Sequence, residues 1–307
     1  MFFEKCDMHM HTTESDGSLT GLELLELASK RNLKKLSVTD HDDIDFYLDP
    51  DIIAYMKKNN IEFITGCEFV CSVDNMPIEI LGYGIDLKEA GDYLSKHAIK
   101  QNSLERFRSE NAPKVFFKKG FKIDYDPSKI NFEKKDPGVL VELLKSVKRN
   151  KKLCAEILKE EKNALNNESC FLRNILNNVN SKFYMDTSGF YPSYIKIIDL
   201  IHQWGGLAFL AHPYQYGKSK ELILKKVKEH NIDGIECYHF TTKNIFKRKY
   251  LIDFCKKNNL MISGGSDFHY PRSVSIDKSH LNELNIPDKI FNDIKKKLEE
   301  KHNKKRA

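Results

Sequence analysis

The feature that most constrains the fold is a series of seven short β-like runs, most of them followed by polar residues that can bind metals or phosphates. The runs cover residues 2–11, 36–39, 61–64, 78–81, 207–210, 234–237 and 260–263. Between several of them lie apolar residues at helical spacing. Strands that alternate with helices predict βα units and a mostly parallel sheet. Seven strands with polar carboxyl ends predict a barrel whose active site lies at those ends.

The middle of the chain has a different pattern. Residues 94–185 contain no convincing strand, are rich in Lys and Asn, and show apolar residues at helical spacing. We therefore predict a discontinuous barrel domain over residues 1–93 and 186–290, with a helical insertion over residues 94–185.

The C-terminal residues 291–307 are predicted to form a basic helix or tail. Residues 295–306 hold seven basic and two acidic side chains, which is nearly the whole net charge of +6. Such a tail is typical of a solvated helix end, and a contact with nucleic acid is the alternative.

Several classes of protein are disfavoured by the sequence. No apolar run approaches the ~20 residues that span a bilayer, and the N-terminal residues do not have the pattern of a secretory signal. The seven cysteines contain no C-x-x-C pair. We expect reduced cysteines, a cytoplasmic location and no membrane partner.

Candidate metal ligands follow the predicted strands. His9 and His11 are two residues apart, so both side chains lie on the same face of a strand and can chelate one metal. Each candidate alone is a weak signal. Together, five histidines and three carboxylates would meet at one mouth of a barrel, where a multinuclear metal site would balance their charges. These residues are His9, His11, Asp16, His41, Glu68, His212, Asp267 and His269.

The same residues carry a resemblance to a known family. The motifs are Asp7-Met8-His9-Met10-His11, Ser15-Asp16-Gly17, Thr39-Asp40-His41, Gly66-Cys67-Glu68-Phe69, Ala211-His212-Pro213 and Gly265-Ser266-Asp267-Phe268-His269. In this order they resemble the PHP family, named for polymerase and histidinol phosphatase, and above all its stand-alone phosphoesterases with a helical insertion. The resemblance implies a distorted (β/α)7 TIM-like barrel, a trinuclear metal site and phosphoester hydrolysis.

The resemblance also implies three ligand sets. His9, His11, Glu68 and Asp267 would bind one metal, and Asp16, His41 and His269 a second. Glu68, His212 and Glu79 would hold the third; relatives commonly have His at the position of Glu79. Two or three divalent ions are expected, of Mn, Zn or Fe, because carboxylates and imidazoles suit all three. Three such ions leave the site about two charges positive, which favours a phosphate dianion.

The expected function is metal-dependent hydrolysis of a phosphoester by a metal-activated hydroxide. The expected substrate is a small phosphorylated metabolite, with a nucleotide as the leading candidate. Histidinol phosphate phosphatase or exonuclease-like activity on short oligonucleotides are the alternatives within enzymes, and a scaffold with a decayed site is the non-enzymatic one. No stable binding of duplex nucleic acid is expected. Expected catalytic residues are Asp16, His41, His269 and His239, and expected substrate contacts are His239, Arg272 and Arg106. Asp7 and Asp40 are expected to orient histidine ligands.

Overall fold

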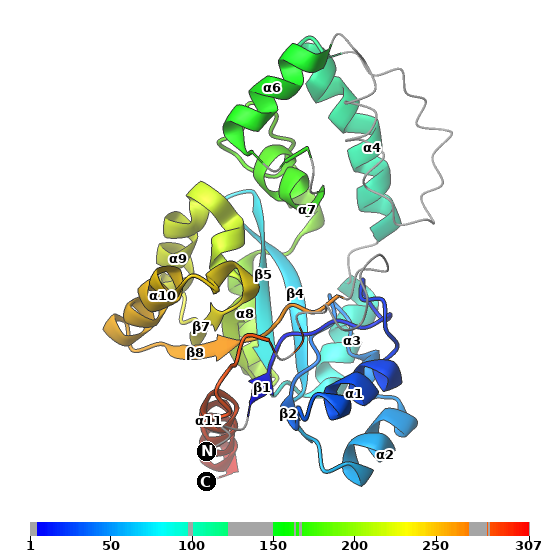
Figure 1. Cartoon of the computed structure of the whole chain (residues 1–307), viewed down its shortest axis with the longest axis vertical. Coiled ribbons are helices and arrows are strands. Elements are labelled where there is room, and N and C mark those ends of the chain that lie inside the picture. The colour runs from blue at the N-terminus through cyan, green and yellow to red at the C-terminus, as the bar shows by residue number, and fades with distance from the viewer. Residues whose placement is uncertain are drawn as a thin grey trace.

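The described strands form two sheets (Figure 1). The computed structural model describes residues 5–97, 101–121, 150–162, 164–165, 168–269, 281 and 283–306. The first sheet is parallel and contains β1 (Cys6–Asp7), β2 (Lys35–Leu36) and β3 (Glu62–Phe63). The second contains, in spatial order, β4 (Gly66–Val73), β5 (Met76–Tyr83), β6 (Leu207–Leu210), β7 (Gly234–Tyr238) and β8 (Met261–Gly264). All seven predicted runs therefore overlap described strands.

The prediction of a TIM-like barrel is confirmed only as a mixed α/β fold, and no closed barrel is found among the described residues. The prediction of a mostly parallel sheet is wrong for β5, which is antiparallel to both β4 and β6. The reason is the two-residue connection Asp74-Asn75, in which both residues have positive φ, 45° and 63°. Such a turn joins antiparallel strands, whereas a parallel pair needs a long crossover.

Backbone hydrogen bonds link the two sheets at two places. The amide of Met8 donates to the carbonyl of Gly264 at 3.1 Å, which joins the end of β1 to the end of β8. The amide of Glu68 donates to the carbonyl of Asp40 at 3.1 Å, which joins the segment after β2 to β4. These links bring the carboxyl ends of β1, β2 and β8 beside the start of β4.

Helices cover the outer faces of both sheets. Against the first lie α1 (Gly21–Lys30) and α2 (Pro50–Lys58), of which α1 begins at a capping box between Thr20 and Glu23. Their buried Leu24 and Met56 pack with Leu36. The remaining helices of this part are α3 (Leu87–His97), α8 (Tyr194–Gln203), α9 (Lys220–Glu229) and α10 (Ile245–Lys257), with short 3-10 helices η1 (Asp45–Tyr47), η5 (Ser188–Phe190), η6 (Pro213–Ser219) and η7 (Phe240–Thr242).

The chain between β5 and β6 contains α4 (Gln101–Lys118), α6 (Lys151–Glu160), α7 (Glu168–Phe171) and a π-helix, η4 (Leu172–Leu176). In Figure 1 these helices stand above the sheets, and no described residue from 94 to 185 belongs to a strand. They share an apolar cluster that includes Phe116, Phe171 and Phe183. The domain boundaries themselves stay a prediction.

The last helix, α11 (Lys289–Arg306), is amphipathic rather than a free tail. Its buried Phe291, Ile294 and Leu298 pack in one apolar cluster with Leu207 and Phe209 of β6. The helix thus contributes apolar contacts to the fold. Among the described residues, no helix is both long enough and apolar enough to cross a membrane.

Tyr47 provides a test of how the segment after β2 is held. Its buried hydroxyl accepts a hydrogen bond from the amide of Val38 (2.9 Å) and donates to the carbonyl of Val38 (2.7 Å). Tyr47→Phe leaves that buried amide without a partner, so we expect a loss of about 1–3 kcal/mol in the free energy of unfolding by urea. Tyr55→Phe on α2, which removes no such bond, should change stability by less. Equal free energies of unfolding for Tyr47→Phe and Tyr55→Phe would contradict this role of the Tyr47 hydroxyl.

Candidate metal centre

Nine predicted ligand residues meet in three groups, most of them just after the carboxyl ends of strands, with Glu68 and Glu79 inside β4 and β5. Within each group the candidate ligand atoms lie within 4.8 Å of one another. The groups are His9, His11, Glu68 and Asp267; His11, Asp16, His41 and His269; and Glu68, Glu79 and His212. The sequence predicted the same membership, except that His11 also adjoins the second group. Their roles as ligands stay a prediction.

Glu68, near the start of β4, is the centre of the cluster. Its side chain is buried, and its Oε2 lies 3.2 Å from Nε2 of His9 and 3.3 Å from Nδ1 of His41. Its Oε1 lies 3.0 Å from Nε2 of His212. One carboxylate thus adjoins all three groups.

The atoms of this cluster fit a bound cation. Nε2 of His9 and Nε2 of His11 lie 3.1 Å apart, and Glu68 Oε2 and His41 Nδ1 are buried without a hydrogen-bond partner. Buried polar atoms are normally hydrogen-bonded or bound to a metal. Lone pairs of two imidazoles and a carboxylate that face one another would share a divalent ion, and this donor set suits Mn, Fe or Zn.

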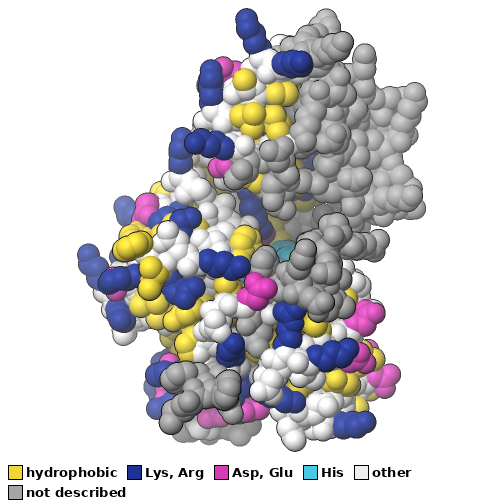
Figure 2. All heavy atoms as spheres, viewed as in Figure 1, with side chains coloured by type: hydrophobic (Ala, Val, Ile, Leu, Met, Phe, Trp, Pro, Cys, Tyr) yellow, Lys and Arg dark blue, Asp and Glu magenta, His cyan; other side chains and the backbone are white. Residues whose placement is uncertain are grey.

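The second group is the most exposed of the three. The side chain of Asp16 is 45% exposed and that of His269 is 31% exposed, and Nε2 of His269 lies 3.1 Å from Oδ1 of Asp16. In Figure 2 a histidine side chain shows in the hollow between the upper helices and the sheets. A substrate from solvent would therefore reach the Asp16 side first.

Two residues of the cluster have left-handed backbone, which non-glycine residues rarely adopt. His212 has φ 27° and Asp267 has φ 54°. The amide of His212 donates to Oε2 of Glu236 at 2.7 Å, and the amide of Asp267 donates to the carbonyl of His9 at 2.9 Å. Strained residues held by surrounding bonds are common at functional sites.

The carboxylates raise the pKa of His9 and His11 and keep both rings protonated when no metal is bound. Burial alone lowers the pKa of His11, but Asp267, Glu68 and Asp16 raise it to about 10. For His9, Glu68, Glu236 and Asp267 outweigh burial in the same way and raise its pKa well above the ordinary value. Partial desolvation opposes ionisation of Asp16, but His41, His269 and His11 outweigh it and hold the pKa of Asp16 well below its usual range.

His239, predicted as a catalytic or substrate-binding residue, is fully buried. Its Nδ1 accepts from the amide of Thr241 (3.2 Å), so its Nε2 carries the proton and donates to Oδ2 of Asp267 (3.1 Å). Burial lowers the pKa of His239, which favours this neutral form. This placement favours a role in holding Asp267. Of the other predicted substrate contacts, Arg106 is exposed on α4 outside the three groups, and Arg272 lies outside the described residues.

Among the described residues neither Asp7 nor Asp40 bonds directly to a histidine ring, but Asp40 accepts from the hydroxyl of Ser15, which lies 3.4 Å from Nδ1 of His11, so their orienting role stays a prediction. Asp7 accepts from the backbone amides of Ser266 and His9, and Asp40 accepts from Thr12 and Ser15. Both carboxylates fix backbone or hydroxyl groups of the loops around the site.

Glu236 of β7 is the group that orients a ring, and it was missed in the sequence. Its Oε1 accepts from Nδ1 of His9 at 2.9 Å, which leaves Nε2 of His9 for the cluster. Its Oε2 accepts from the amide of His212. Arg173 and Gln215 were also missed; they bond to Glu79 and Asp267, respectively.

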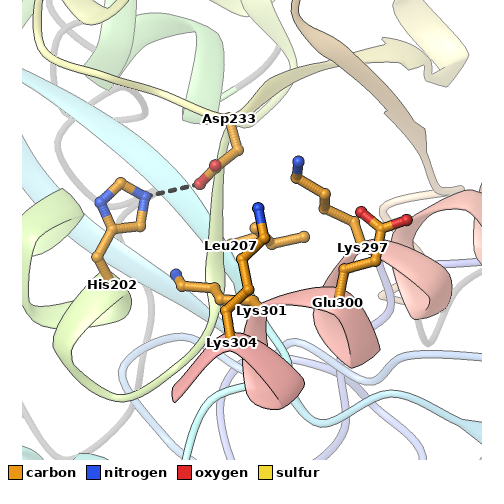
Figure 3. Close-up of a pocket in the computed structure, with 7 residues that line it drawn as sticks. All are labelled: His202, Leu207, Asp233, Lys297, Glu300, Lys301 and Lys304. Carbon is orange, nitrogen blue, oxygen red and sulfur yellow. Dashed lines mark hydrogen bonds and ion pairs between the residues drawn. The ribbon is translucent and has the colours of Figure 1, made fainter. Parts of the chain in front are cut away.

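A separate basic pocket lies at the opposite, amino ends of β6 and β7 (Figure 3). Its volume is about 390 Å³, and its lining includes the ion pair of His202 and Asp233 and the lysines 297, 301 and 304 of α11. None of the nine candidate ligands lines it.

Comparisons with known proteins agree with this site. A PHP domain model matches residues 7–250, so the chain belongs to the PHP domain family. Relatives include a 5'-3' exoribonuclease of Haemophilus influenzae, 28% identical over 87% of this chain and 91% of that protein. A 3',5'-nucleoside bisphosphate phosphatase of Chromobacterium violaceum is 24% identical over 91% of this chain and 92% of the relative.

Solved structures show the same fold. An amidohydrolase from Chromobacterium violaceum superposes with a TM-score of 0.63 at 21% identity, covering 97% of this chain and 96% of its own. A protein of Bifidobacterium adolescentis, described as a candidate metal-dependent phosphoesterase, gives 0.61 at 19% identity, covering 94% of each chain. Together with the family match, the relatives confirm the prediction of a metal-dependent hydrolase that acts on phosphoester bonds.

Glu236→Gln tests the orientation of His9. A glutamine has one acceptor atom for two donors, so it keeps the bond to His9 or the bond to the amide of His212 and loses the other. We expect the affinity for Mn²⁺, measured by equilibrium dialysis, to fall about 10–100-fold. Glu229→Gln, on the exposed end of α9, is the matched control. An affinity equal to that of the control would contradict the positioning role.

Metal affinity should rise with pH. Because the folded-state pKa of His11 is raised to about 10 in the metal-free protein, a proton occupies this ligand at neutral pH and an ion must displace it. Calorimetric titration with Mn²⁺ in buffers of different ionisation enthalpy should show proton release near neutrality, and each displaced proton gives about tenfold tighter binding per pH unit. Metal binding without proton release would show that His11 is already neutral in the metal-free protein.

Proposed function

We propose that this protein hydrolyses a phosphoester bond of a nucleotide, with divalent ions held by the clustered histidine and carboxylate side chains. The observation that supports this most is the buried Glu68, which belongs to two of the three groups and lies 3.3 Å from His41 of the remaining, solvent-exposed group that contains Asp16. Mn, Fe and Zn all suit these donors, and at least two ions are proposed, one in each group that contains His11.

The position of each candidate residue indicates its role in the reaction. Bound ions would lower the pKa of a water molecule and stabilise negative charge on the phosphoryl oxygens. Asp16 and His269, on the exposed side, hold that part of the centre where substrate enters. Glu236 holds the proton on Nδ1 of His9, and His239 holds Asp267 through its Nε2 proton.

Two substrate classes have specific support. The Chromobacterium violaceum relative, named a 3',5'-nucleoside bisphosphate phosphatase, supports a small nucleotide. The Haemophilus influenzae relative, named a 5'-3' exoribonuclease, supports short RNA with a 5' end at the centre. Both reactions cleave one phosphoester bond next to a nucleoside, so one centre can serve both. Histidinol phosphate has no such support here, and a decayed scaffold would not keep nine ligand-type residues together.

A cytoplasmic location is part of the proposal. It is supported by the seven cysteines, all of which are free thiols in the structure.

The test is phosphate release by the Mn²⁺-loaded full-length protein. The panel holds 3',5'-nucleoside bisphosphates, mononucleotides, short 5'-phosphorylated oligoribonucleotides and histidinol phosphate. We expect activity on a nucleotide class that falls more than about a hundredfold in Asp16→Ala, because a ligand is lost. Asp199→Ala, on an exposed position of α8, is the control.

The products separate the two classes. Loss of phosphate from a bisphosphate alone indicates a phosphatase, whereas a ladder of mononucleotides from RNA indicates an exonuclease. No turnover of any nucleotide by metal-loaded protein, or full activity of Asp16→Ala, would overturn the proposal.

A further inference from the structure

The third group, Glu68, Glu79 and His212, differs from the other two because one of its carboxylates forms an ion pair with an arginine side chain. Nη2 of Arg173 donates to Oε1 of Glu79 at 2.9 Å. The other carboxylate oxygen of Glu79 lies 3.4 Å from Nε2 of His212. In the part of the chain that the structure describes, no Lys or Arg forms an ion pair with Asp16, Glu68 or Asp267.

The position of Arg173 is fixed by the packing of its helix. Arg173 lies on the π-helix η4, a local feature that is frequent at functional sites. The neighbouring Asn174 lies against Gly217 of η6, where a Cβ atom would come within 2.9 Å of the Asn174 side chain. Since η6 directly follows His212, the insertion helix is docked on the segment that carries a member of the third group.

Charge and burial set what this group can hold. The side chains of Glu79 and Arg173 are only 12% and 23% exposed, so water screens their interaction weakly. The guanidinium neutralises the carboxylate that a third divalent ion would need, and it would repel such an ion. Glu68, the other carboxylate of this group, is also a member of the first group and lies 3.3 Å from Nδ1 of His41 in the second.

We propose that the guanidinium of Arg173 takes the place of a third metal ion, so that this chain holds two ions and one built-in cation. This rests on the proposed function only in assuming that the first two groups bind ions. In the described structure Nη1 of Arg173 is buried without a hydrogen-bond partner, which leaves it as a donor on that side of the centre. The positive charge there is then independent of metal supply.

The test counts metal ions without substrate. Metal-free full-length protein is brought to equilibrium with Mn²⁺ by dialysis, and bound metal per chain is measured by mass spectrometry. We expect two ions in the wild type. Arg173→Met removes the charge and should bind a third ion at free Mn²⁺ concentrations where the wild type still holds two, with at least about tenfold higher affinity for that ion.

Two further variants control the result. Arg173→Lys keeps a charge and should stay at two ions. Arg108→Met removes an arginine of α4 that donates to the neutral hydroxyl of Tyr191, and it should also stay at two.

The inference is overturned if the wild type binds three ions, a result that stands even if Arg173→Met does not fold. It is also overturned if folded Arg173→Met binds only two. Because the count needs no substrate, inactivity on nucleotides would reject the proposed function and leave this result intact.

Discussion

The buried carboxylate of Glu68 sets the requirement that the rest of the site meets. A carboxylate removed from water is stable only beside positive charge or hydrogen-bond donors. Its oxygens lie within 3.4 Å of imidazole nitrogens of His9, His11, His41 and His212. In the metal-free protein His9 and His11 supply this charge as imidazolium ions, because neighbouring carboxylates outweigh burial and raise the pKa of both rings. Their nitrogens can bind cations once these protons leave. The same cluster is therefore stable in both states, with protons and metal ions in competition for the same atoms.

The fold brings these rings around Glu68 through two backbone hydrogen bonds between the sheets. The bond from Met8 to Gly264 and the bond from Glu68 to Asp40 join the two sheets on either side of the cluster. Candidate ligands from the ends of β1, β2 and β8 thereby reach the start of β4, although the described strands form no closed barrel. At Gly265 the approach is so close that a Cβ atom would lie 2.1 Å from Cβ of His9, which accounts for glycine two residues before the candidate ligand Asp267.

Much of this arrangement could be predicted because buried strands leave short apolar runs and the candidate ligands follow them directly. The hairpin of β4 and β5 was missed in part because β4 alternates Cys67, Phe69, Cys71 and Val73, all buried, and cysteine is easily overlooked as a small apolar residue. Its turn, Asp74-Asn75, lacks the glycine that makes a hairpin obvious. The prediction of a parallel sheet failed at β5 because the direction of a strand depends on the turn that precedes it and not on its own apolar residues.

The side chains that the sequence did not reveal are charges that compensate predicted ligands. Glu236 stands inside a strand, and its only signal was a carboxylate in an apolar run, where a buried Glu must be paired. Arg173 meets Glu79 across 94 residues of sequence, and no local pattern predicts such a contact. Local sequence shows which residues can bind a metal. Compensating charges decide which nitrogen of a histidine faces the ion and how many ions the centre accepts, and these charges are brought into place only by tertiary packing.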